Sequence, residues 1–441
     1  MSDGLSPSNV DFTASLLKVA DWLELLYQLK EQGKLEKTQY YLIPLLEIYL
    51  FTILSQVEVL TYDKAARLAK SQWEVNMCYC FCEIVFGEGV TYFFGFDKNG
   101  QNKHFKTKEL NSYLTTKKLG NEIIAACNSF FEKCKNSNLF LDLKRDKNIS
   151  KHFDLDYTNV IDHYVKANSD VNRARANLYF KWLTELNNLI EQFSTDNPIV
   201  IYADSRLSFV KKEIKGVIIP QFQDYDVILK KIEMGEKQLI ADYALFKNHS
   251  ERINYLCCND LRYDYSAVVL FKQCKTATEL FKSCCHIQFV ELSICYAIKA
   301  YAECTDNMEK QINLYRILLA YYEGFKKLYG FNDRKENTLL YSLKQFVAPL
   351  SDEALQKKYT DIDTELHKQI GKAKRYESTR NIITHNKDDN KDCILEKFYS
   401  LVKINPTELL CDAGQLLGIT RPLMELTDAL AQRYLPEYWK P

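Results

Sequence analysis

The chain has 441 residues, which is too long for one ordinary core and fits either two domains or one large helical body. Lysine plus arginine equals aspartate plus glutamate at 58 each, so no net field draws the protein to nucleic acid or to a membrane surface. Any contact with RNA must therefore come from local basic clusters.

The cysteines indicate a reducing compartment. There are 14 of them, mostly inside apolar periodic segments, and no Cys-x-x-Cys pair occurs. We therefore expect buried free thiols, with no disulfide framework and no metal site.

The N-terminus lacks the apolar core of a signal peptide, and the most apolar stretch, 41–54, is too short to cross a bilayer. These features favour a cytoplasmic protein in which this stretch is a core helix.

Helical periodicity dominates the chain. Glycine and proline are scarce, at 14 and 9 residues, and apolar residues recur at spacings of three and four. Asn405 and Pro406 give the last helix a clear start, as cap and first-turn residue. The sequence therefore predicts an all-α fold. The expected helices are 12–30, 38–59, 62–85, 118–135, 169–193, 224–247, 263–281, 286–304, 307–329, 338–347, 361–384 and 407–433.

Two segments interrupt this periodicity. Residues 89–96 and 199–219 are rich in β-branched and aromatic residues and have turn-forming residues nearby, among them Gly89. Each segment therefore predicts a small β-hairpin inserted into the helical body. The second follows the turn-forming cluster 194–198, which comes directly after a strong helix. We therefore place a domain boundary there, which gives helical-bundle domains of residues 1–198 and 199–441.

An arginine followed by a polar residue and a histidine stands near the end of the second half. Arg380, Asn381 and His385 have four residues between Arg and His. A permanently charged guanidinium and an imidazole that titrates near neutrality can together cleave a phosphodiester without a metal ion. The nearby Lys374 and Arg375 are expected to bind the RNA backbone.

A looser version of the same pattern lies in the first half. Arg145, Asp146 and His152 have six residues between Arg and His, and Lys144 and Lys151 are the accompanying basic residues. In both halves the pattern precedes an acidic stretch and then a long helix. The repeated order of parts predicts a degenerate tandem duplication.

These two patterns resemble the signature of the HEPN superfamily of helical domains. The resemblance implies an α-helical bundle and a metal-independent endoribonuclease site where two motifs face each other. The histidines would act as general acid and base, the arginines would stabilise the phosphorane charge, and Asn381 or Asp146 would orient its neighbours. By analogy only, the role would be that of a toxin or an antiviral defence protein, and the site would assemble within one chain or in a homodimer. Some members instead serve as partners of nucleotidyltransferases.

The alternative is a catalytically inert helical interaction or regulatory module. In that interpretation the motif residues hold helix ends together, for example through an ion pair between Arg380 and a carboxylate. No nucleotide-binding or zinc-protease motif is present, so no cofactor is expected. His163 has no partner at metal-ligand spacing along the sequence, which predicts no metal site there.

Overall fold

The computed structural model describes residues 12–94, 157–167, 169–196, 225–259, 265–331, 338–384 and 394–435, together with a few positions between 125 and 137. Apart from one short 3-10 turn at Lys37–Gln39, every regular element in these ranges is an α-helix, and none is a strand. The fold is therefore an all-α helical bundle, as the periodicity predicted.

The helices fall into two groups along the chain. The first group is α1 (Phe12–Glu31), α2 (Leu42–Leu68), α3 (Gln72–Phe94), α7 (Tyr157–Lys166) and α8 (Ser169–Asp196). The second group is α9 (Tyr225–Asn259), α10 (Tyr265–Glu303), α11 (Asn307–Leu328), α12 (Leu339–Val347), α13 (Glu353–Lys374), α14 (Glu377–Thr384), α15 (Ile394–Val402) and α16 (Pro406–Tyr434).

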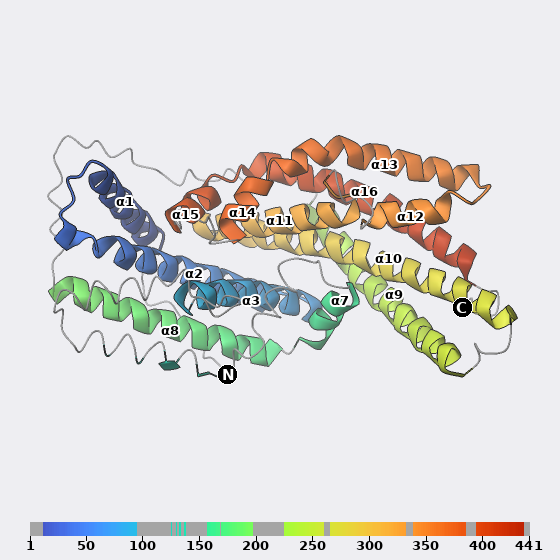
Figure 1. The fold of residues 1–441 in the computed structure, drawn as a ribbon, viewed down its shortest axis with the longest axis horizontal. Coiled ribbons are helices and arrows are strands. Elements are labelled where there is room, and N and C mark those ends of the chain that lie inside the picture. Colours follow the sequence, from blue (N-terminus) through green and yellow to red (C-terminus); the bar gives the residue numbers. More distant parts are fainter. Residues whose placement is uncertain are drawn as a thin grey trace.

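The first group occupies one end of an elongated molecule and most of the second group the other, with α14, α15 and part of α11 lying above α2 and α3 in this view (Figure 1). In the first, α2 packs against α1, α3 and α8; in the second, α10 packs along α9, α11 and α16. Helices α11 and α15 join them by contacting α2, and all these helices contribute to one hydrophobic core. The boundary after residue 198 lies outside the described residues, so the division into two domains stays a prediction.

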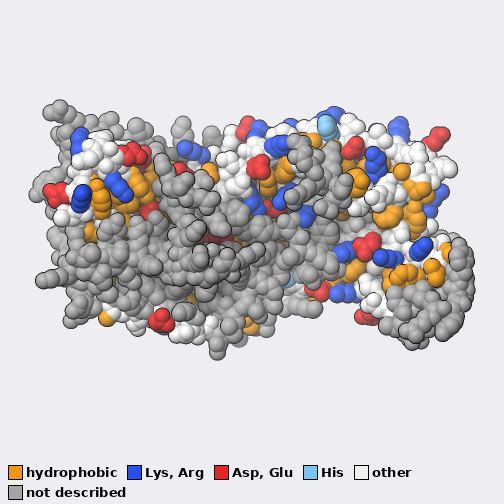
Figure 2. Space-filling model, viewed as in Figure 1, with side chains coloured by type: hydrophobic (Ala, Val, Ile, Leu, Met, Phe, Trp, Pro, Cys, Tyr) orange, Lys and Arg blue, Asp and Glu red, His pale blue; other side chains and the backbone are white. Residues whose placement is uncertain are grey.

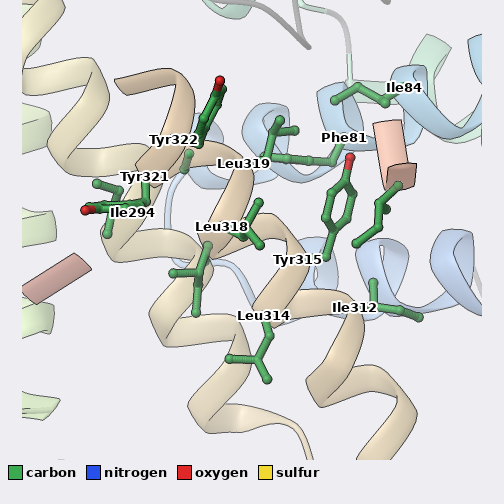
Figure 3. Packing of buried hydrophobic residues seen from close by; sticks show 14 of the residues in the cluster. Phe81, Ile84, Ile294, Ile312, Leu314, Tyr315, Leu318, Leu319, Tyr321 and Tyr322 are labelled. Atoms are coloured by element: carbon green, nitrogen blue, oxygen red, sulfur yellow. The ribbon is translucent and has the colours of Figure 1, made fainter. Parts of the chain in front are cut away.

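Helix α11 is the centre of the second group and is buried along most of its length. Its side chains point toward several neighbours, with Tyr315 lying near Phe81 of α3 (Figure 3). The close approach of α10 is visible at Gly324, where an added Cβ would lie 2.5 Å from Val290 Cγ1. A helix surrounded on all sides has few water-facing positions, so any charged side chain on it must find its partner inside the protein.

The predicted hairpin at 89–96 is wrong, because α3 continues as a helix to Phe94. Gly89, which suggested a turn, lies where α3 and α8 almost touch. A Cβ at this position would be 1.8 Å from Tyr179 Oη, so the glycine serves close helix packing rather than a turn. The second predicted hairpin, 199–219, lies outside the described residues.

Several predicted helix ends are also wrong. The break expected after residue 59 occurs instead at residues 69–71. There Ser71 Oγ accepts a hydrogen bond from the backbone N–H of Glu74 at 3.1 Å. In turn, Glu74 Oε2 accepts one from the backbone N–H of Lys70 at 2.9 Å. This pair of side-chain caps starts α3. Helix α10 runs unbroken through residues 282–285, where a break was expected. The helix predicted over 361–384 is divided at Arg375 and Tyr376 into α13 and α14.

The apolar stretch near residue 41 is part of α2 and is a core helix. The helical segment Lys37–Leu68 is long and apolar enough to cross a membrane by length and composition, but 94% of its most apolar window is buried inside the protein. This burial is that of a core helix, as predicted.

Candidate functional site

The division between α13 and α14 allows Arg380 of the second motif to face inward. Tyr376, Arg380 and Ile383, spaced by four and three residues, are all buried, whereas Asn381 is exposed. This spacing defines one face of a short helix, and that face lies against α11 and α15. Arg380 therefore belongs to the interior of the protein, and its polar neighbour belongs to the surface.

Arg380 forms an ion pair with Glu323 of α11, through Nη2 and Oε1. The arginine side chain is 6% exposed and the glutamate side chain is fully buried. The other terminal nitrogen, Nη1, donates to Asn381 Oδ1 at 3.0 Å, and the guanidinium lies 5.6 Å from the ring centre of Tyr322. Burial raises the pKa of Tyr322, as expected for a phenol in this dry environment.

This geometry fixes the guanidinium in one orientation. A bond from Arg380 to a carboxylate is charge-assisted and strong, and the low dielectric of the interior increases its strength. The ion pair with Glu323 also neutralises the positive charge of Arg380, which a phosphate would need for binding. For Arg380 to stabilise a phosphorane, it must exchange Glu323 for the substrate.

The other predicted residues of the second motif have different surroundings. Lys374 ends α13 and is exposed. Arg375 donates to Asp412 Oδ2 at 2.5 Å and to Glu408 Oε1 at 3.3 Å, both on α16, so its charge is already balanced by carboxylates. On the face shown in Figure 2, basic and acidic side chains of the described residues are interspersed.

The first motif lies outside the residues that the structure describes. Arg145, Asp146 and His152 lie outside the described residues, as do Lys144, Lys151 and His385. The structure therefore brings together Arg380 and Asn381 from the predicted set. Whether the two motifs form a composite site stays a prediction.

A small cavity lies beneath α14, between the two groups of helices. Its lining includes Ile383 of α14, Glu58 and Glu88 of α2 and α3, and Lys397 of α15. Lys397 Nζ is 3.7 Å from Glu58 Oε1. Burial raises the pKa of Glu58, although Lys397 partly opposes this rise. The cavity is thus a largely apolar pocket within the core that contains three charged side chains, close to the end of the motif helix.

Sequence reasoning missed both Glu323 and Glu58. Each stands alone within an apolar helical segment, in Ala-Tyr-Tyr-Glu-Gly-Phe and Gln-Val-Glu-Val-Leu respectively. A single carboxylate in an otherwise buried helix signals an internal cation, because burying an unpaired charge is costly. That signal was available, but it does not identify the partner across the fold.

Comparison with protein-family models, with curated proteins and with solved structures finds no match to this chain.

Proposed function

We propose that this chain is a metal-independent endoribonuclease of the HEPN type, and that Glu323 holds its motif arginine in a resting state. The observation that carries the proposal is the arrangement at the end of α14. Arg380 is fixed there by Glu323 and by Asn381, the polar neighbour that the resemblance assigns to orientation, and the motif histidine follows Arg380 by five residues in the sequence.

In the proposed reaction a ribose 2′-OH attacks the adjacent phosphate and leaves a 2′,3′-cyclic phosphate and a 5′-OH. His385 moves the proton, and Arg380 stabilises the developing phosphorane after it leaves Glu323. Asn381, already exposed and bonded to the guanidinium, guides Arg380 toward the substrate. The second His and Arg come from the first motif, or from a second copy of the chain.

A nuclease that is inactive at rest suits a toxin or antiviral defence protein, because unregulated RNA cleavage would harm the host. The cytoplasm is the compartment that fits both an RNA substrate and free cysteines. A nucleotidyltransferase is a partner class that the HEPN resemblance also allows.

A second candidate function, an inert helical interaction module, is favoured by the burial of Arg380. In that case the Arg380–Glu323 pair only anchors α14 to α11. The two candidates differ in what Glu323 does: it restrains a catalytic group in the first and stabilises a scaffold in the second.

The test measures cleavage of total RNA and tRNA in EDTA by the wild type and by Glu323→Gln, His385→Ala and Arg380→Ala, with analysis of the product ends. Glutamine keeps a hydrogen-bond acceptor for the guanidinium but removes the charge, so Glu323→Gln is expected to cleave about tenfold faster than the wild type. His385→Ala and Arg380→Ala should lose cleavage, and the products should carry cyclic phosphate.

The matched control is Arg421→Ala, which removes an exposed arginine of α16 that pairs with the exposed Glu425. It should cleave like the wild type. If folded wild type and folded Glu323→Gln both leave RNA intact, the nuclease proposal fails and the interaction module is preferred. Cleavage that persists in folded His385→Ala would equally remove this motif from the site.

A further inference from the structure

A cysteine, a glutamate and a histidine meet where α7 packs on α3. Cys80 and Glu83 are three residues apart on α3, which places their side chains on neighbouring positions of one helix face. His163 comes from α7. The ligand atoms of these three residues all lie within 4.8 Å of one another. The cluster is independent of the motif helix α14.

The position of α7 is fixed by contacts beside the cluster. Asn76 Nδ2 donates to the backbone carbonyl of Tyr164 at 2.8 Å, and the ring of Tyr164 lies 4.9 Å from that of Phe289 on α10. His163, the preceding residue, is thereby held over α3, with its Nε2 at 2.8 Å from Glu83 Oε2. The three groups are therefore preorganised by the fold rather than placed on a mobile loop.

The chemistry of the three groups suits zinc. Thiolate, imidazole and carboxylate are its usual protein ligands, at about 2.3 Å for sulfur and about 2.0–2.2 Å for nitrogen and oxygen. Cys80 is fully buried and the side chain of Glu83 is 2% exposed, whereas His163 retains 15% exposure and marks the side open to solvent. Atoms already within 4.8 Å need only small rotations to surround one ion.

The charges nearby are compatible with a divalent ion. Arg175 Nη1 lies 3.8 Å from Glu83 Oε1, the carboxylate oxygen opposite to the one that faces His163. The arginine therefore approaches the carboxylate through Oε1, whereas the imidazole approaches it through Oε2. A thiolate and a carboxylate together balance the charge of one Zn²⁺.

We propose that Cys80, Glu83 and His163 form a zinc site in which a fourth position is left for water or another ligand. Binding releases the thiol proton of Cys80 to solvent, and the neutral imidazole of His163 exchanges its contact with Glu83 for the metal. Such a site ties α7 to α3. The sequence contains no paired-cysteine motif for this site, because its ligands are a Cys-x-x-Glu pair and a histidine 80 residues further along the chain.

The test uses the full chain, stripped of metal under reducing conditions and then titrated with Zn²⁺ and with Co²⁺. We expect about one equivalent of zinc to bind and to raise the melting temperature. Cobalt should give a thiolate-to-metal charge-transfer band, which requires a cysteine ligand. Wild type that binds neither ion, or binds cobalt without this band, overturns the proposal.

Variants then locate the site. Cys80→Ser should lose the charge-transfer band, and His163→Ala and Glu83→Gln should weaken binding by roughly 10–100-fold or more. The matched control is Cys295→Ser, which changes another fully buried thiol, on α10, and should leave cobalt binding unchanged. Retention of the band by folded Cys80→Ser, or its loss in folded Cys295→Ser, would place the metal elsewhere.

Discussion

Glu323 and Glu83 are both buried carboxylates, but they have different partners. Glu323 contacts the guanidinium of Arg380 directly, and this cation cannot give up its proton near neutral pH. Glu83 is contacted at 2.8 Å by an imidazole, while its arginine lies at 3.8 Å on the far oxygen. The Arg380–Glu323 pair can change only when a side chain moves. The groups around Glu83 can also release a proton and bind a metal ion.

This comparison explains why the two regions are assigned different roles. The α14 region holds one permanent ion pair, so its chemistry depends on whether that pair opens. The α3–α7 region holds three groups that bind metals, so its chemistry depends on what it takes up. Two stability experiments examine whether the carboxylates differ as strongly as their contacts indicate, and a third, on His286, gives a reference for the cost of burial.

The largest effect is expected from Arg380→Met. This change leaves Glu323 as a buried charge without its main partner, which should lower the free energy of unfolding by about 3–5 kcal/mol. Urea denaturation followed by tryptophan fluorescence measures it. The double variant Arg380→Met with Glu323→Leu should recover most of the loss, because it removes the unpaired charge. A loss below about 1 kcal/mol would show that the pair is not the strong contact described here.

His286 provides a reference for the cost of burial. Burial is the main cause that lowers the pKa of this histidine to about 3, and the nearby Lys327 and Lys282 lower it further. The unfolded chain binds a proton below about pH 6.5 and the folded chain does not, so stability falls as the pH drops from 6.5 toward 3.

Comparison with His286→Leu isolates this effect. In this pH window the free energy of unfolding of the wild type should fall by about 1.4 kcal/mol more per pH unit than that of the variant. At pH 4.5 the difference should reach roughly 3 kcal/mol. Urea denaturation at pH 7.5, 5.5 and 4.5 measures the difference. Parallel pH profiles for the two proteins would mean that His286 is hydrated in the folded state.

The smallest effect is expected from Arg175→Met. Arg175 approaches Glu83 only at 3.8 Å and is 14% exposed, so its removal should cost about 1 kcal/mol, well below the cost at Arg380. Cobalt binding should survive, because the contact of the arginine is with Oε1 and not with the oxygen that faces His163. The same urea titration measures both variants. If Arg175→Met and Arg380→Met lower the free energy of unfolding equally, the two buried carboxylates do not differ as described.

Local signals predicted the all-α class and most of the described helices, but not α7 or α15. Asn405 accepts from the backbone amides of Thr407 and Glu408 at 3.1 and 3.3 Å, as expected for the cap of the last helix. The Ser71–Glu74 cap of α3 was equally visible in the sequence but was not used, which explains the wrong break near residue 60. Gly89 misled the prediction, because a glycine needed for packing looks the same in sequence as one needed for a turn.

The partners of the site residues were harder to predict, because they depend on contacts far apart in the chain. Arg380 was expected to pair with a carboxylate if it were structural, but nothing local points to Glu323, 57 residues earlier. His163 has no partner at metal-ligand spacing nearby in the sequence, because Glu83, which it contacts, is 80 residues away. Helix periodicity predicts which face is buried, and only the tertiary arrangement selects the partner.

The most direct test of the account compares the initial rate of RNA cleavage in EDTA by the wild type and by Glu323→Gln, after circular dichroism has confirmed that both are folded. If Glu323 restrains a catalytic arginine, the variant should cleave about tenfold faster and leave 2′,3′-cyclic phosphate ends. If the variant cleaves no RNA, or cleaves it more slowly than the wild type, the restrained-nuclease proposal is contradicted.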